Sequence, residues 1–144
     1  MTVQTGGQEL LAAVLSDEHA AVYAYGVLGA RLPAPLRAVA LADFDAHRVR
    51  RDDLASRLRA GGQSPEGPRP AYAVQVVGRV DALELAVRVE DGLAVRWRDL
   101  VAGTSDPTLR RLGVSGLQDS AVRAALWRRT AGIRPTTVPL PGSV

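Results

Sequence analysis

The chain has 144 residues, the size of one domain, and we treat residues 1–144 as a single domain. It has no cysteine, which excludes disulfides and thiolate metal ligands and is typical of a reducing, cytoplasmic compartment. The net charge of +3 comes from arginine alone, without lysine, and 4% of the residues are aromatic, so nucleic acid is not an expected partner. No apolar run approaches the roughly 20 residues of a membrane helix.

Four segments rich in alanine, leucine and arginine predict helices, because these residues favour helices and glycine and proline gather between the segments. The predicted helices span residues 8–31, 36–60, 82–102 and 107–131. The tail 132–144 contains three prolines and is expected to be extended. The fourth helix is the least regular, because Gly113 and Gly116 favour a kink or a later start.

Two helix starts carry recognisable signals. Asp81 followed by Glu84 resembles a capping box at the start of the third helix. Ser105 or Asp106 before Pro107 predicts a cap followed by a first-turn proline.

The first and third helices carry apolar stripes with the same unusual interruption. Each stripe has 4-3-4-3-4 spacing, which places its members on one helix face, and each has a glutamate in third place with an aromatic residue seven positions later. A shift of 72 residues superposes the two stripes and suggests two related helical hairpins. The stripes are Leu11, Leu15, Glu18, Val22, Tyr25, Gly29 and Leu83, Val87, Glu90, Ala94, Trp97, Val101.

The lengths of the connections predict the topology. The first and third are short, so helices one and two, and helices three and four, should form antiparallel hairpins. The middle connection, about residues 61–80, is long enough to cross the whole bundle, since about 20 extended residues reach roughly 66 Å. Its apolar part, Ala71–Val80, should pack along the bundle, with an isolated strand as the competing interpretation. We therefore predict an all-α, ferritin-like four-helix bundle with a long crossover between helices two and three.

Ionisable side chains also fall on the stripes of the second and fourth helices. All four helices would thus direct a charged or polar group to a similar level of the core, where a lone charge costs several kcal/mol and needs a partner. The two stripes are Leu36, Ala40, Asp43, His47, Arg50, Leu54 and Leu112, Ser115, Asp119, Val122, Leu126.

One interpretation of these groups is a carboxylate site for iron or manganese. Dinuclear carboxylate bundles use a Glu from each of two helices and a Glu-x-x-His pair from each of the other two. The sequence departs from this pattern, since Phe44 stands three residues before the only well-placed histidine and Arg123 follows the last carboxylate. The candidate ligands are Glu18, Asp43, His47, Glu90 and Asp119.

The competing interpretation is a buried ion-pair network without metal. Arg50, Arg51 and Arg123 are placed to neutralise the four carboxylates by forked hydrogen bonds. A guanidinium inside the site would also repel a divalent ion. Tyr25 and Trp97 are expected to be core aromatics, each with a partner for its polar atom, and His19 a hydrogen-bonded side chain at a helix interface.

In several segments the chain resembles an uncharacterised actinobacterial family that is classed as a ferritin-like domain of unknown function. The resemblance covers nearly the whole chain; it implies a ferritin-like bundle that forms a homodimer, and it implies no activity. The segments are Glu18–Gly26 (EHAAVYAYG), Ala46–Asp52, Pro70–Ala73, Val89–Asp91, Ala121–Ala125 with Trp127, and Pro139–Gly142.

Three functions remain open from the sequence. The first is a ferritin-like bundle that lacks an intact di-iron site, is not an enzyme and keeps its helix register through a buried carboxylate, histidine and arginine network. The second is a metal-dependent oxidase or storage-related protein that uses the five candidate ligands. The third is a basic interaction module that acts on nucleic acid or on an acidic partner.

Overall fold

The computed structural model describes residues 2–143, with side chains from residue 6 onward, and consists of four long helices. They are α1 (Thr2–Gly29), α2 (Ala34–Ala60), α3 (Arg79–Gly103) and α4 (Pro107–Ala131). The predicted all-α, four-helix architecture is confirmed. Helix α1 begins earlier than expected and includes Gly7, where a Cβ would lie 3.1 Å from the Leu109 side chain.

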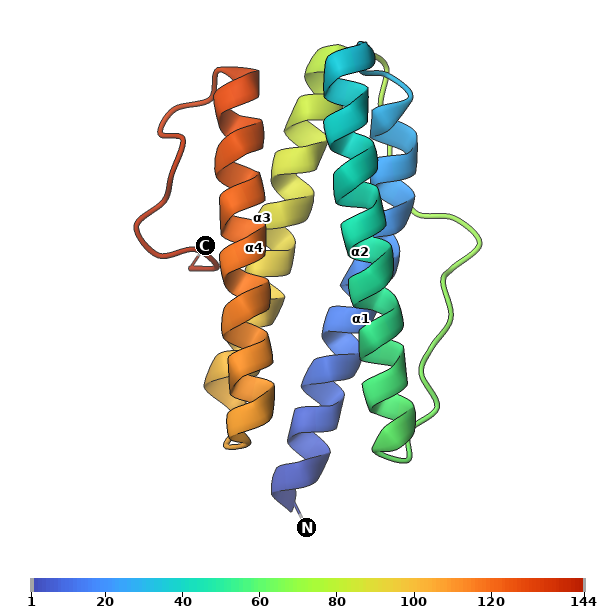
Figure 1. Ribbon diagram of the computed structural model, residues 1–144, viewed down its shortest axis with the longest axis vertical. Helices are drawn as coiled ribbons and strands as arrows, with labels where there is room; N and C mark the ends of the chain where they lie inside the picture. Colours follow the sequence, from blue (N-terminus) through green and yellow to red (C-terminus); the bar gives the residue numbers. More distant parts are fainter. Residues whose placement is uncertain (1, 144) are drawn as a thin grey trace.

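The middle connection runs the length of the bundle, as predicted. Figure 1 shows it leaving the lower end of α2 and rising to the upper end of α3, so that both short connections join antiparallel neighbours. Val76 is buried and Tyr72 packs on Tyr23, with 5.3 Å between ring centroids. His19 donates from Nε2 to the carbonyl of Glu66 at 3.0 Å, which ties the connection to α1. The segment pairs with no other strand in the described part of the chain.

The helix starts match the sequence signals in part. Asp106 caps α4 as predicted, because its Oδ1 accepts hydrogen bonds from the backbone of Thr108 and Leu109. The prediction for α3 was wrong in register. The helix begins at Arg79, and Asp81 lies in its first turn, where Oδ2 accepts from the backbone N–H groups of Val77 and Gly78.

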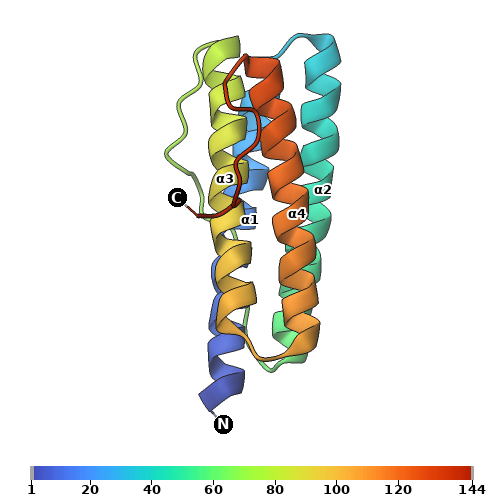
Figure 2. The ribbon, with the colours of Figure 1, turned by 90° about the vertical axis from the view of Figure 1, so that its left-hand side faces the viewer.

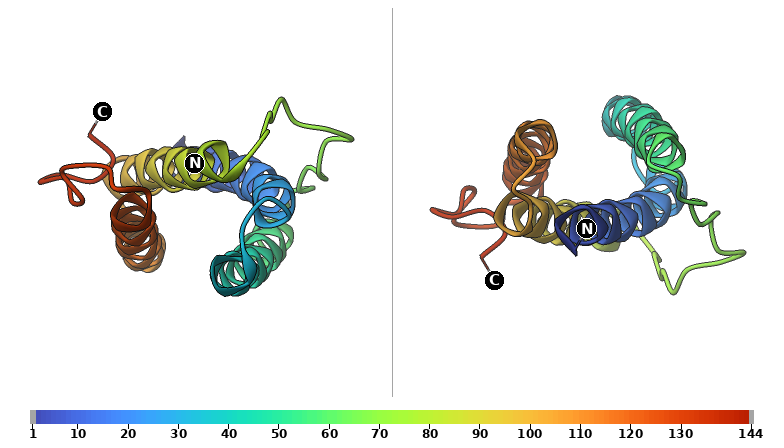
Figure 3. Two further views of the ribbon diagram at one scale, coloured as in Figure 1. Left: turned by 90° about the horizontal axis from the view of Figure 1, so that it is seen from above. Right: turned by 90° about the horizontal axis from the view of Figure 1, so that it is seen from below.

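The four helices do not pack equally closely. The close pairs are α1 with α2, α3 with α4, and α1 with α3; α2 and α4 do not form such a pair. Seen end-on, α1 and α3 lie side by side, while α2 and α4 project from the same side of them as the two arms of a U (Figure 3). A groove of about 620 Å³ lies between these arms, lined by Ala46, Arg50, Leu112 and Ser115 among others.

The prediction of the core stripe was right for three helices and wrong for α4. Val122 and Leu126, predicted to be buried, are 59% and 46% exposed. The inward face of α4 carries small residues instead, and a Cβ on Gly116 would lie 2.3 Å from the ring of Trp97. Small side chains carry little hydrophobic signal, which is why the pattern pointed to the wrong face. The inward residues are Gly113, Gly116, Ser120, Ala124 and Trp127.

The tail folds back over α3 and α4 (Figure 2). Arg98 donates from Nη1 to the carbonyl of Gly142 at 2.8 Å. Gly142 has φ +82°, and a Cβ there would meet the carbonyl of Ala94 at 2.7 Å, so only glycine fits this contact. In the described part of the chain, none of the helices has the length and apolar character needed to span a bilayer.

Candidate functional site: a buried polar network

His47 lies at the centre of the bundle between two glutamates. Its Nδ1 is 2.7 Å from Oε2 of Glu18 on α1, and its Nε2 is 2.9 Å from Oε1 of Glu90 on α3. All three side chains are at most 1% exposed. The predicted convergence of Glu18, His47 and Glu90 in the core is therefore confirmed.

The two carboxylates decide the protonation state of His47. Burial by itself would lower the pKa of this imidazole, because it disfavours the charged form. The hydrogen bonds to Glu18 and Glu90, and the charges of the same carboxylates, outweigh burial and raise the pKa of His47 to about 9. At neutral pH the ring is therefore an imidazolium, and both ring nitrogens donate.

Further hydrogen bonds extend from Glu90 to the edge of the bundle. Tyr25 donates to Oε1 of Glu90 at 2.6 Å, and Nε1 of Trp127 lies 3.0 Å from both the Tyr25 hydroxyl and Oδ2 of Asp43. Arg123 donates from Nε to Oδ1 of Asp43 at 3.1 Å. We refer to these seven residues as the core network, which joins all four helices: Glu18, Tyr25, Asp43, His47, Glu90, Arg123 and Trp127.

Burial and neighbouring charge also act on the other titratable members. Burial raises the pKa of the Tyr25 hydroxyl well above its usual value, and the charges of Glu90 and Asp43 act in the same direction. Tyr25 is therefore a neutral donor at physiological pH. Burial raises the pKa of Asp43 as well, against the opposing effect of Arg123.

Arg50 and Asp119 form a separate ion pair at the edge of the bundle. Arg50 on α2 donates to Asp119 on α4, and its guanidinium lies 5.1 Å from the centre of the Trp97 ring. The side chains of Arg50 and Asp119 are 19% and 45% exposed. Asp119 is thus the one candidate ligand that lies outside the core, as expected once α4 presents its small-residue face inward.

The network differs from the sequence-based prediction in its counter-ions. Arg50 and Arg123 do pair with carboxylates, but Arg51 binds the neighbouring Asp52 at the surface. His47, and not an arginine, pairs with both glutamates; it supplies one positive charge for the two carboxylates, and Oε2 of Glu90 has no hydrogen-bond partner among the described residues. Sequence reasoning missed Trp127, whose indole N–H joins Tyr25 to Asp43. The sequence showed it only as part of the family resemblance and on the same face as Gly116 and Ser120.

The donor set does not fit a dinuclear carboxylate centre. The ring nitrogens of His47 point in opposite directions, so an ion on the Glu90 side would have the imidazole between itself and Glu18. Asp43 and Asp119 are each bound by a guanidinium, which repels divalent ions. Among residues 6–143, no group of three or more His, Cys, Asp or Glu side chains is arranged to hold a metal ion. Binding of a single ion by some of the five candidate ligands stays a prediction.

The fold and the level of the buried carboxylates define a ferritin-like bundle. The chain is similar to a crystal structure from Bacillus anthracis str. Ames described as ferritin like, diiron-carboxylate proteins, with a TM-score of 0.79 and 17% identity. The match covers 91% of this chain and 99% of that chain. At this identity the likeness establishes the fold and not the metal chemistry.

The chain belongs to the family described as domain of unknown function DUF4439, whose family profile matches residues 10–144. It is also similar to the crystal structure of a conserved hypothetical protein from Mycobacterium tuberculosis, with a TM-score of 0.84 and 32% identity. That match covers 88% of this chain and 97% of the other. The resemblance inferred from the sequence is confirmed. No curated protein matches the chain.

Proposed function

We propose that this protein is a metal-independent, non-enzymatic bundle that acts as a homodimer, with the core network holding its helices in register. The observation that carries the first part is the position of His47, which has a carboxylate on each ring nitrogen within 2.9 Å. Its protonated ring supplies, at the centre of the bundle, the positive charge that buried carboxylates need. The absence of cysteine supports a cytoplasmic location.

The core network has features that suit a role in fixing register. Its hydrogen bonds join side chains on all four helices, and most of them are buried. Sliding one helix by a single turn, about 5.4 Å, would break them and leave buried charges unpaired. Apolar packing alone tolerates such shifts better, because it is less directional.

Metal loading separates this proposal from a metal-dependent oxidase or storage protein. Protein purified without a histidine tag is incubated with Fe²⁺ or Mn²⁺, desalted and measured by elemental analysis and thermal melting. We expect less than about 0.1 metal per chain and no rise in Tm, since a ligand of the native state alone must stabilise it. Near-stoichiometric metal that disappears in Glu90→Gln would contradict the proposal and support the metal-binding alternative.

The homodimer is proposed to form through the outer surface of α2 and α4, which we name the α2–α4 face. Helices α2 and α4 expose six large hydrophobic side chains, and we assign four of them to this face: Val39, Val49, Val122 and Leu126, 46–71% exposed, with Leu41 and Val114 the other two. Helices α1 and α3 together expose only Tyr23 and Val80 among the large hydrophobic residues whose burial is described. A concentration of apolar surface on one face is typical of an interaction surface.

The size of the α2–α4 face matches what a dimer requires. Helix α2 has 27 residues and is therefore about 40 Å long, and the two helices on either side of the groove, each about 10 Å wide, have a combined width of about 20 Å. The product, about 800 Å², equals the area that each partner buries in a standard interface. A second copy is the proposed occupant, because a twofold axis lets the same α2–α4 face serve both partners.

Substitution on this face, with a matched control, tests the dimer. The chain mass is 15.2 kDa, so light scattering after gel filtration at about 100 µM should give twice that mass. Val122→Arg should yield monomer, because burial of a charge in an apolar contact is unfavourable. Leu41→Arg should remain a dimer. Leu41 is also 59% exposed, but it lies about 200° around α2 from Asp43, which faces α4. A monomeric wild type, or equal effects of the two variants, would overturn this part of the proposal.

A further inference from the structure

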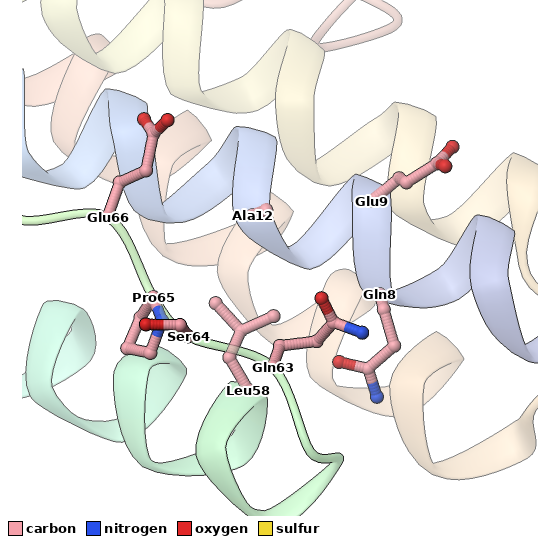
Figure 4. Close-up of a pocket in the computed structure, with 8 residues that line it drawn as sticks. All are labelled: Gln8, Glu9, Ala12, Leu58, Gln63, Ser64, Pro65 and Glu66. Atoms are coloured by element: carbon pink, nitrogen blue, oxygen red, sulfur yellow. The ribbon is translucent and has the colours of Figure 1, made fainter.

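A small pocket lies at the far end of the bundle from the upper loops, where the middle connection leaves α2. Its volume is about 220 Å³, and it is enclosed by α1, by the last turn of α2 and by the start of the connection. Figure 4 shows the side chains of Gln8 and Gln63 extending into the same space from α1 and from the connection, with Leu58 beside them. The core network does not reach this pocket.

The carboxamide of Gln8 lies against the backbone of Gly61, where only glycine leaves room for it. A Cβ on Gly61 would lie 2.4 Å from Nε2 and 3.0 Å from Oε1 of Gln8, so the carboxamide occupies the space that any other residue would fill. Oε1 of Gln8 is buried and has no hydrogen-bond partner. A buried acceptor without a donor costs about 1–3 kcal/mol, and a ligand that supplies an N–H recovers that cost.

The charge around the pocket selects the kind of donor. Glu9 and Glu66 line it, and none of the lining residues among those described is basic. In Figure 4 both carboxylates point away from the space between Gln8, Gln63 and Leu58. The hydroxyl of Ser64 is a further acceptor in the lining. Acidic groups around a small recess attract cations by raising their local concentration.

We propose that this pocket binds the ammonium group of a small aliphatic amine. The ammonium donates to Oε1 of Gln8 and to the oxygens of Gln63 and Ser64, and its short carbon chain lies against Leu58 and Ala12. The carboxylates of Glu9 and Glu66 attract it from a distance. The volume suits a ligand well below drug size. Because His19 binds the carbonyl of Glu66 at 3.0 Å, the ligand also contacts the anchored part of the connection.

The test uses 1,4-diaminobutane as the probe and follows backbone amides by NMR at low ionic strength. We expect saturable chemical-shift changes centred on residues 8–12 and 61–66. The uncharged 1,4-butanediol, which has the same length, and the dianion succinate should bind at least ten-fold more weakly. Equal binding of the diol, or shifts spread evenly over acidic surface residues, would overturn the proposal.

Two variants locate the interaction. Gln8→Leu removes the acceptor and keeps the approximate side-chain size, and should weaken diamine binding about ten-fold or more. Gly61→Ala should have a similar effect, because it displaces the carboxamide. Gln118→Leu, which alters an exposed glutamine on α4, is the matched control and should bind as the wild type does. Unchanged affinity in Gln8→Leu, with an unchanged melting temperature, would contradict the assignment; the oligomeric state and metal content test the proposed function independently.

Discussion

The α1–α3 pair and the α2–α4 pair are held together by different means. Helices α1 and α3 pack directly against each other, and each contributes a glutamate that is at most 1% exposed. Helices α2 and α4 are joined by two ion pairs, Arg123–Asp43 and Arg50–Asp119, whose side chains are 16–45% exposed. The same chemistry, carboxylate with cation, therefore occurs in two environments of one molecule.

This difference indicates where charge matters for stability. A buried ion pair is strongly destabilising when one partner is removed, because the remaining charge has neither water nor a counter-ion. A pair near solvent loses little, because water replaces the missing partner. We therefore expect substitutions in the buried group of Glu18, His47 and Glu90 to have several times the effect of those in the more exposed Arg50–Asp119 pair.

The largest effect is expected from His47→Leu. This change leaves Glu18 and Glu90 buried without their shared cation, and should lower the free energy of unfolding by about 3–5 kcal/mol in urea denaturation. Replacing all three together by apolar residues (Glu18→Met, His47→Leu, Glu90→Met) should recover part of the loss, since these three buried charges are gone while Tyr25 loses its acceptor on Glu90. If His47→Leu lowered the free energy of unfolding by less than about 1 kcal/mol, the buried group would be no more sensitive than the exposed Arg50–Asp119 pair.

The pH dependence of stability should report the same site. The pKa of His47 is about 9 in the folded protein, against an ordinary value of 6.5 for a solvated histidine. Because it is raised on folding, its contribution is fully present below pH 6.5 and is lost as the pH rises through 9. The shift corresponds to about 3 kcal/mol. Urea midpoints between about pH 6 and 9.5 should fall in the wild type and much less in His47→Gln; a flat wild-type profile would contradict a charged His47.

Two glycines, Gly116 on α4 and Gly92 on α3, test how tightly these two helices are packed. In Gly116→Ala the new Cβ would lie 2.3 Å from the Trp97 ring, and overpacking of this kind costs about 1–3 kcal/mol. Gly92→Ala on α3 meets no atom within 4 Å, and should stabilise the protein by about 0.5–1 kcal/mol through helix propensity. Thermal melts of the two variants should therefore move in opposite directions. Equal shifts would mean that α3 and α4 are not packed so tightly.

The number and approximate extent of the helices, the crossover and the buried glutamates could be predicted from the sequence, since each depends on local composition or on a stripe with helical spacing; the starts of α1 and α3 could not. Glu18 and Glu90 stood out because each interrupts an apolar stripe. The inward face of α4 could not be found in this way. Its burial follows from the bulk of Trp97 on another helix, and its small residues have no hydrophobic signature of their own.

The sequence also did not predict which cation pairs with each buried carboxylate. Arg50, Arg51 and His47 all stood within reach of the core on a helical projection of α2, and spacing alone did not decide among them. The structure assigns the glutamates to His47 because its ring is short enough to remain fully buried, whereas the longer arginines extend to the rim. Pairing between helices depends on side-chain reach and burial, which a linear pattern records only indirectly.

The smallest effect is expected at Asp119, at the solvent-exposed end of the comparison. Asp119→Asn removes the charge opposite Arg50 and should cost at most about 1 kcal/mol, because 45% of the Asp119 side chain is exposed. The cost should disappear in about 1 M salt, where the Debye length falls to roughly 3 Å. Arg50→Met should cost more than Asp119→Asn, since it also removes the guanidinium from the face of Trp97. If Asp119→Asn were as damaging as His47→Leu, solvent exposure would not explain the difference between the Arg50–Asp119 pair and the buried group of Glu18, His47 and Glu90.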